Sequence, residues 1–325
     1  MLGITRREVI TLLGGAVAWP LAARAQQSAD RIRRIGVLLL GNAGAEALQT
    51  ELREGLRKVD FIDGKTLQFE VRSANDRVDL LPRIAAELVA LKVDVIVALF
   101  TPSALAAKQA TSEIPIVFLA GDAVGTGLVP NLARPVGNLT GVSVLGAELQ
   151  GKCVELLRDM LPSARRVAAV GYAADPFSKP FIDQVQLAGR TSGIEIDPIV
   201  MLREPDEIDG AFATMATAHV DAVVLSATFA TKQVADLALK YRLAAATNQR
   251  AFAEAGGLIS YGYNAPDLYR RVTTFVQKVL QGNKPADIPV EQPTRFELVI
   301  NLRTAKALGL AIPESFLTRA DEVIE

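Results

Sequence analysis

Short apolar runs alternate with amphipathic stretches along most of this 325-residue chain. Residues 33–40 read RRIGVLLL, an apolar run typical of a parallel strand covered on both faces, and an amphipathic helical pattern follows over 45–59. Further strands are expected at 66–71, 93–99 and 114–119. A chain that repeats strand, loop and helix in this way folds as an α/β protein, because parallel strands need a crossover, usually a helix, between them.

The second half of the chain resembles the first half. Residues 165–170, RRVAAV, parallel 33–38, RRIGVL, and residues 220–224, VDAVV, parallel 93–97, VDVIV. The pairs occur in the same order at similar separations, which favours two copies of one βαβ plan, although alternating α/β chains also produce such pairs by chance. Two copies predict two similar lobes, each a doubly wound parallel sheet, joined by a multi-strand hinge with a cleft between them.

The stretch 121–143, GDAVGTGLVPNLARPVGNLTGVS, interrupts this alternation. Its glycines, together with Pro130 and Pro135, break any long helix, so we expect an extended connector that crosses from one lobe to the other. The segments 261–264 and the residues before 296 are expected to cross back. The predicted lobes are 26–142 plus 263–283, and 143–262 plus 284–325.

The first 25 residues have the features of a secretory signal peptide. Arg6 and Arg7 precede an apolar run, 9–23, that ends in the A-x-A cleavage site at 23–25. The run is shorter than the about 20 residues that a membrane-spanning helix needs. We therefore expect cleavage near Ala25 and a mature protein free in the periplasm, exported by either the Tat or the Sec route.

The composition argues against an enzyme and against a metal or nucleic-acid-binding protein. The chain has one histidine, His219, and one cysteine, Cys153, so they cannot form a His- or Cys-rich metal site. No nucleophile–base motif is present. Cys153 lies in a leucine-rich helical pattern, which favours a buried inert thiol over a reactive one. With 35 basic and 36 acidic residues, the chain has no basic field for nucleic acid. We expect no catalytic residue, cofactor or metal.

The loops after the predicted strands carry short polar and aromatic residues. Ligands of doubly wound sheets bind outside the carboxyl ends of the strands, where these loops meet. Helix starts at 101–103, with Thr101 as the N-cap, and at 175–178 expose N–H groups suited to a carboxylate, although simple helix capping explains both equally well. Asp122 or Asp175 would suit an amine. The predicted ligand-binding residues are Asn42, Thr101, Ser103, Asp122, Tyr172, Asp175, Phe177, Thr228 and Tyr261.

Two segments resemble a known family. The run 122–141, DAVGTGLVPNLARPVGNLTG, and the tail 301–324, which starts NLRTAKALGL and ends RADEVI, are similar to the ABC-transporter substrate-binding proteins, in the branch with a type I periplasmic binding fold. The similarity spans essentially the whole mature chain. Val136 stands where the family more usually has a second glycine.

The resemblance implies delivery of a small solute to an inner-membrane ABC permease, with aromatic amino acids among the family's ligand classes. We therefore expect a monomeric periplasmic receptor that closes its two lobes over a small anionic or zwitterionic solute. An alternative is a periplasmic sensor that reports the ligand to a signalling partner. A third hypothesis, an exported enzyme on the same fold, is weakened by the missing nucleophile–base pair.

Overall fold

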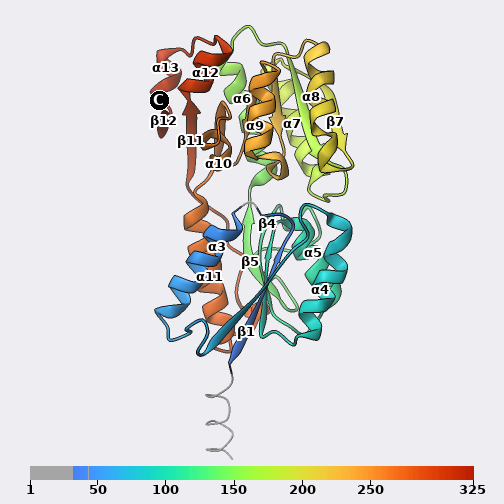
Figure 1. Cartoon of the computed structure of the whole chain (residues 1–325), viewed down its shortest axis with the longest axis vertical. Helices are drawn as coiled ribbons and strands as arrows, with labels where there is room; N and C mark the ends of the chain where they lie inside the picture. Colours follow the sequence, from blue (N-terminus) through green and yellow to red (C-terminus); the bar gives the residue numbers. More distant parts are fainter. Residues whose placement is uncertain (1–31, 43) are drawn as a thin grey trace, which may run out of the picture.

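The structure is a computed structural model that describes residues 32–42 and 44–325. The predicted signal peptide, residues 1–25, lies outside the described residues. The described chain forms two α/β lobes stacked along the long axis of the molecule (Figure 1). Each lobe is built around one sheet with helices on both faces. The expected architecture of two parallel-sheet lobes is confirmed.

The N-terminal lobe is built on a five-stranded sheet in which all strand pairs are parallel. In order across the sheet, the strands are β2 (Leu67–Ser73), β1 (Arg33–Leu39), β3 (Val95–Leu99), β4 (Ile116–Gly121) and β5 (Leu139–Val144). One face packs against α3 (Ala45–Arg57) and α11 (Ala265–Leu280), and the other packs against α4 (Leu81–Ala90) and α5 (Thr101–Ala110).

The C-terminal lobe is built on a seven-stranded sheet. In order, its strands are β12 (Glu322–Ile324), β11 (Phe296–Asn301), β10 (Ile259–Tyr263), β9 (Ala244–Thr247), β8 (Ala222–Leu225), β6 (Arg166–Tyr172) and β7 (Glu195–Leu202). Only the pair β10–β11 is antiparallel among these described strands.

Helices cover both faces of this second sheet. One face packs against α6 (Gly146–Met160), α7 (Ser178–Ser192), α12 (Leu302–Leu308) and α13 (Glu314–Leu317). The other face packs against α8 (Ile208–Thr217), α9 (Lys232–Lys240) and α10 (Arg250–Glu254). The lobe is therefore doubly wound, like the N-terminal lobe.

Strand β1 illustrates why its sequence is apolar throughout. Ile35, Val37 and Leu39 lie in the core beside α3 and α11, whereas Leu38 lies in the core beside α4 and α5. Successive side chains of a strand face opposite sides of the sheet. Both sides are buried here, so the uninterrupted apolar run is the pattern that a central parallel strand requires.

The prediction that the connector crosses between the lobes is wrong. Strand β5 pairs in parallel with β4 from Leu139 to Val144, so residues 122–138 link neighbouring strands of the same N-terminal sheet. The chain first crosses after Val144, where α6 begins. It returns between β10 and α11, at Asn264, and crosses a last time before β11.

Residues 285–291 lie against the N-terminal lobe, although the sequence placed them with the C-terminal lobe. Ile288 belongs to the core beside α3 and α11. The Glu291 N–H donates to the Gly141 carbonyl, and the Ser143 N–H donates to the Glu291 carbonyl. These bonds add a short parallel bridge to the free edge of β5, which satisfies backbone groups that an edge strand otherwise exposes.

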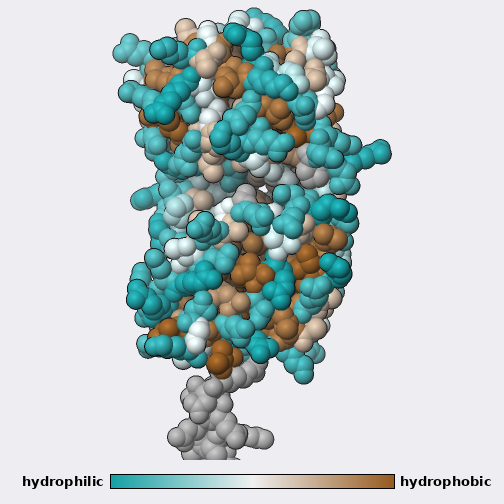
Figure 2. Space-filling model, in the orientation of Figure 1, coloured by the Kyte–Doolittle hydropathy of each residue, from teal (hydrophilic) through white to brown (hydrophobic). Residues whose placement is uncertain are grey.

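The surface in the space-filling view is mostly hydrophilic, and a narrow waist separates the two lobes (Figure 2). Strand β1 starts at the outer end of the N-terminal lobe, whereas the C-terminus lies on the C-terminal lobe (Figure 1). Among the helices of residues 32–42 and 44–325, none has the length and apolar character to cross a membrane.

Candidate functional site

A cavity of about 190 Å³ lies between the lobes beside the hinge. Leu99, Phe100 and Gly121 line it from the carboxyl ends of β3 and β4. Ala227 and Gln249 line it from the loops that follow β8 and β9. This is the position where doubly wound sheets bind ligands. The volume is below the range of about 300–1,000 Å³ that is usual for drug-sized ligands, so the cavity suits a small solute.

A smaller cavity of about 30 Å³ adjoins the main one, and three helices begin beside it. Its walls include Thr101 at the start of α5, Gly146 at the start of α6, and Phe177 just before α7. The N-cap residues are Phe100, Leu145 and Phe177, whose hydrocarbon side chains cannot accept a hydrogen bond. Helix starts carry a partial positive charge, so three of them together favour an anion. The Ser178 N–H at the start of α7 already donates to the Asp175 carbonyl at 2.9 Å, so free donors come mainly from the starts of α5 and α6.

Asn248 closes the smaller cavity from the C-terminal lobe and is only 2% exposed. Its Oδ1 accepts a hydrogen bond from Gln150 Nε2 at 3.0 Å, and the same Nε2 donates to the Leu225 carbonyl at 2.9 Å. These bonds fix the plane of the amide. Asn248 Nδ2 has no acceptor among the described residues, so it adds a buried, oriented donor to the helix starts.

Asp175 supplies a carboxyl group to the same cavity. Burial raises its pKa to about 6, and a hydrogen bond from the Phe177 N–H to Asp175 Oδ1, 2.9 Å long, opposes this shift. A ligand amine beside Asp175 would stabilise the ionised form. The cavity therefore offers donors for a carboxylate and one acceptor for an amine.

Phe177 shows that the lobes are closed on each other. Its ring lies against Gly121 of the N-terminal lobe, where a Cβ would stand 2.8 Å from Phe177 Cδ2. At Gly146 a Cβ would stand 2.9 Å from Phe177 Cζ. Any larger side chain at these two positions would displace the ring. Glycine therefore permits the contact between the lobes at the inner end of the cleft.

A second contact joins the lobes through the loop after β2. Tyr172 Oη donates to the Asp76 carbonyl across the interface, at 3.4 Å. Val78 packs against the core beside α4 and also against the core beside α8 and α9. One apolar side chain of the N-terminal lobe thus contributes to both lobes.

The structure places the predicted site residues in several environments. Thr101, Asp175, Phe177 and Thr228 line the smaller cavity. Tyr172 makes the contact between the lobes described above. The other four predicted residues line neither cavity: Asn42, Ser103, Asp122 and Tyr261.

Local interactions account for two of these four, Asp122 and Tyr261. Asp122 Oδ1 accepts a hydrogen bond from the Gly125 N–H at 2.9 Å within its own turn. Tyr261 lies within β10, not in a loop, and its ring stacks on Phe296 with a centroid distance of 6.2 Å. Ser103 is fully buried, and its hydroxyl has no partner in the described part of the chain. Asn42 lies on an open groove beside the main cavity.

The predicted cap of α5 is also wrong. Thr101 is the first helical residue and Phe100 is the N-cap, with φ +69° and ψ +157°. The Thr101 hydroxyl donates to the Gly121 carbonyl at 3.2 Å and so ties the helix start to the end of β4. Phe100 adopts a backbone region that is essentially restricted to glycine, and its ring lines both cavities.

Sequence reasoning missed Asn248, Gln249, Tyr263 and Tyr269. Asn248 and Gln249 follow β9, whose sequence AAAT gives a weak strand signal, so the sequence does not predict a binding loop there. Tyr263 lies two residues after Tyr261, at the carboxyl end of the same strand. The rule that ligands gather at carboxyl ends of strands was sufficient to find these three residues.

The described residues contain no group of His, Cys, Asp and Glu side chains that could hold a metal ion. Cys153 is buried, and burial raises the pKa of its thiol to about 12. The thiol is therefore protonated and enclosed, as the leucine-rich pattern predicted.

A wide groove of about 510 Å³ lies outside the cleft, on the hinge. The start of α11 and residues 293–295 line it, including Arg270 and Arg271. Arg270 pairs with Asp267, and Arg271 pairs with Glu291 at 2.6 Å. These arginines are neutralised by neighbouring carboxylates, so the groove is a weaker candidate than the cleft.

Comparison with known proteins agrees with this geometry. The family described as ABC transporter substrate binding protein matches residues 35–324. A tyrosine-binding protein of Clostridioides difficile (strain R20291) is 26% identical over 265 residues, which are 79% of this chain and 75% of that protein.

Two solved structures are similar over nearly the whole described chain. A conserved domain protein from Vibrio cholerae has a TM-score of 0.84 at 25% identity and covers 90% of this chain and 100% of its own. An ABC domain from Streptococcus pneumonia in complex with L-Trp has a TM-score of 0.81 at 25% identity, with 89% and 100% covered. Because the family match extends across both lobes, the chain belongs to the ABC transporter substrate binding protein family, with the type I periplasmic binding fold.

Proposed function

We propose that the protein is the periplasmic receptor of an ABC import system and that its ligand is a small zwitterionic aromatic solute. The receptor closes its two lobes over the solute and delivers it to an inner-membrane permease. The observation that supports this proposal most strongly is the convergence of three helix starts and the Asn248 amide on one end of a largely apolar cavity between the lobes.

The ligand carboxylate lies in the smaller cavity in this proposal. There the N–H groups at the starts of α5 and α6 and Asn248 Nδ2 donate to its oxygens, and the positive end of α7 adds to the field. Charge-assisted hydrogen bonds of this kind are about twice as strong as neutral ones. The ligand ammonium lies beside Asp175 and stabilises its ionised carboxylate, whose pKa burial raises.

The aromatic body of the ligand lies in the main cavity. Phe100 and Tyr263 contribute rings to its walls, and Leu99 and Ala227 contribute apolar surface. The relatives support this class of ligand, since one is named as a tyrosine-binding protein and another was solved with L-Trp. Ligand that contacts both lobes stabilises the closed arrangement, because those contacts exist only when the lobes meet.

Binding is tested by calorimetry and thermal unfolding with L-tryptophan, L-tyrosine, L-phenylalanine and their decarboxylated amines. A ligand at about 100 times its Kd stabilises the folded state by about 2.7 kcal/mol, which raises the Tm by about 5 °C for a protein of this size. The amines should not bind, because they lack the carboxylate. Native mass spectrometry of the purified protein would detect a retained solute.

The site is tested with Asn248→Asp, which keeps the shape of the side chain but replaces the donor with a negative charge. It should weaken amino-acid binding about 100-fold, equivalent to about 3 kcal/mol. Asn283→Asp is the matched control, because Asn283 is exposed on the outer surface after α11. Equal affinity of the two variants would place the carboxylate elsewhere.

The transport role is tested in cells. Deletion of the gene should abolish high-affinity uptake of the ligand, and the bound ligand should be recovered chemically unchanged after incubation with the protein. A sensor would instead leave uptake intact and alter gene expression.

A further inference from the structure

The main cavity opens at one side into a groove on the N-terminal lobe. The groove lies between the starts of α3 and α11 and shares Gly44, Ala47, Pro266 and Tyr269 with the main cavity. The smaller cavity shares other residues with the main cavity, including Gly121 and Ala227, and none with the groove. The main cavity therefore has two ends: one adjoins the smaller cavity with its hydrogen-bond donors, and the other lies beside Tyr269.

Tyr269 lies where the main cavity meets the groove, and it is 7% exposed. Its ring packs in the core beside α3, but its hydroxyl has no hydrogen-bond partner among residues 32–42 and 44–325. Its oxygen remains accessible to solvent from the cavity, so a ligand ring that covers it must offer a hydrogen bond or leave the hydroxyl unpaired. Burial, with a smaller effect of Tyr263, raises the pKa of Tyr269, so the hydroxyl stays protonated and can both donate and accept.

Gly44 leaves room for this hydroxyl. Its φ is +72°, which favours glycine, and a Cβ at this position would collide with Tyr269 Oη. Tyr263, the other tyrosine of the main cavity, already accepts a hydrogen bond from Gln249 Nε2 at 2.7 Å. Tyr269 is thus the tyrosine whose hydroxyl is left without a partner at the cavity wall.

We propose that Tyr269 recognises a hydrogen-bonding group at the end of the ligand opposite its carboxylate. This inference rests on the proposed function and narrows its ligand class. A ligand with its carboxylate at the helix starts and its ring in the main cavity extends its far end towards Tyr269. The cleft therefore prefers an aromatic amino acid with a hydroxyl or amino group at the para position, because an unsubstituted ring leaves the Tyr269 hydroxyl unpaired.

The test compares L-tyrosine with L-phenylalanine, which differ by one hydroxyl, on the wild type and on Tyr269→Phe. The wild type should bind L-tyrosine about tenfold more tightly, the equivalent of one net hydrogen bond. Tyr269→Phe should lose this preference through weaker binding of L-tyrosine, while L-phenylalanine binds as before.

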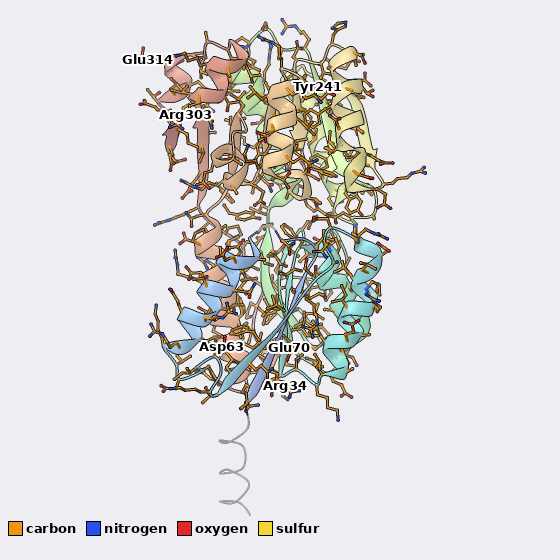
Figure 3. The ribbon with its side chains drawn as sticks, viewed as in Figure 1. Arg34, Asp63, Glu70, Tyr241, Arg303 and Glu314 are labelled. Atoms are coloured by element: carbon orange, nitrogen blue, oxygen red, sulfur yellow. The ribbon has the colours of Figure 1, made fainter. Side chains whose placement is uncertain are left out.

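Tyr241→Phe is the matched control. Its hydroxyl bonds to Asp209 Oδ1 at 3.2 Å in the C-terminal lobe, away from the waist between the lobes (Figure 3). This variant should keep the wild-type preference. A second measurement uses the wild type alone: 4-aminophenylalanine should bind more tightly than 4-methylphenylalanine, whose substituent has a similar size but cannot form a hydrogen bond.

The inference is overturned if Tyr269→Phe still prefers L-tyrosine to L-phenylalanine, or if it weakens the binding of both amino acids equally. It is also overturned if the wild type binds the amino and methyl analogues with equal affinity. The failure of the proposed function has a different signature: the wild type then binds none of these amino acids, and both proposals fall together.

Discussion

The backbone conformation of Phe100 predicts that glycine at this position makes the protein more stable than alanine does. At this residue, φ is +69° and ψ is +157°, a region that residues with a Cβ rarely adopt. Holding such a residue there costs about 1–3 kcal/mol. Phe100→Gly and Phe100→Ala both remove the ring and all its contacts, so the difference between them isolates the backbone.

The magnitude follows from two opposing effects. Glycine removes the strain of about 1–3 kcal/mol, but it also gains freedom in the unfolded chain, which costs about 0.4–1 kcal/mol relative to alanine. Phe100→Gly should therefore be more stable than Phe100→Ala by about 1–2 kcal/mol, a Tm difference on the order of 4 °C. Both variants should lose ligand affinity, because the ring lines both cavities.

The assay measures unfolding by urea or heat in the absence of ligand, monitored by far-ultraviolet circular dichroism. Ala86→Gly serves as the control at an exposed position inside α4, where glycine should cost about 1 kcal/mol in the usual direction. If Phe100→Ala is the more stable of the two variants, the backbone at this position is unstrained and the reasoning fails.

Three further predictions concern pH, closure and export. Burial raises the pKa of Asp175 to about 6 from about 3.9 in the unfolded chain, so the folded state binds the extra proton and loses stability as the pH rises from about 4 to 6. Asp175→Asn should thus raise the free energy of unfolding by about 2 kcal/mol at pH 7 and leave it unchanged at pH 4. An equal increase at both pH values would show that ionisation of Asp175 does not cause the loss of stability. Val78→Asp should open the lobes, which small-angle scattering would detect as a larger radius of gyration. It should also weaken ligand binding, although Val78 lines neither cavity. An unchanged radius of gyration and an unchanged affinity would show that Val78 does not stabilise the closed arrangement. The mature protein should start near Gln26 in the periplasmic fraction, and recovery of intact residues 1–25 with the membrane would refute the cleavage site.

Much of the fold could be predicted because its signals are local. The apolar run of β1 and its counterpart at 165–170 indicated buried parallel strands in two lobes, and the motifs at 122–141 and 301–324 indicated the family. The lobe to which a strand belongs is not a local property. β5 therefore seemed to lead away from the first sheet, although it pairs with β4 of that sheet.

The site was harder to predict, because it depends on how near each residue lies to the carboxyl end of its strand and on contacts across the cleft. Tyr261 and Tyr263 lie two apart on one strand, yet only Tyr263 reaches the cavities, since Tyr261 packs on Phe296. Thr101 looked like the N-cap because threonine favours that position. The structure instead places Phe100 there in a conformation that no propensity predicts.

The two ends of the described chain belong to different lobes, β1 starting at the outer end of one and the C-terminus lying on the other (Figure 1). A hinge motion changes the separation of two points that ride on different rigid bodies. A donor dye near Ile32 and an acceptor dye after Glu325 would thus report ligand binding as a change in fluorescence energy transfer. The protein could thus serve as a solute biosensor with dyes attached at its two ends, and no dye or fluorescent domain would have to be inserted into either sheet.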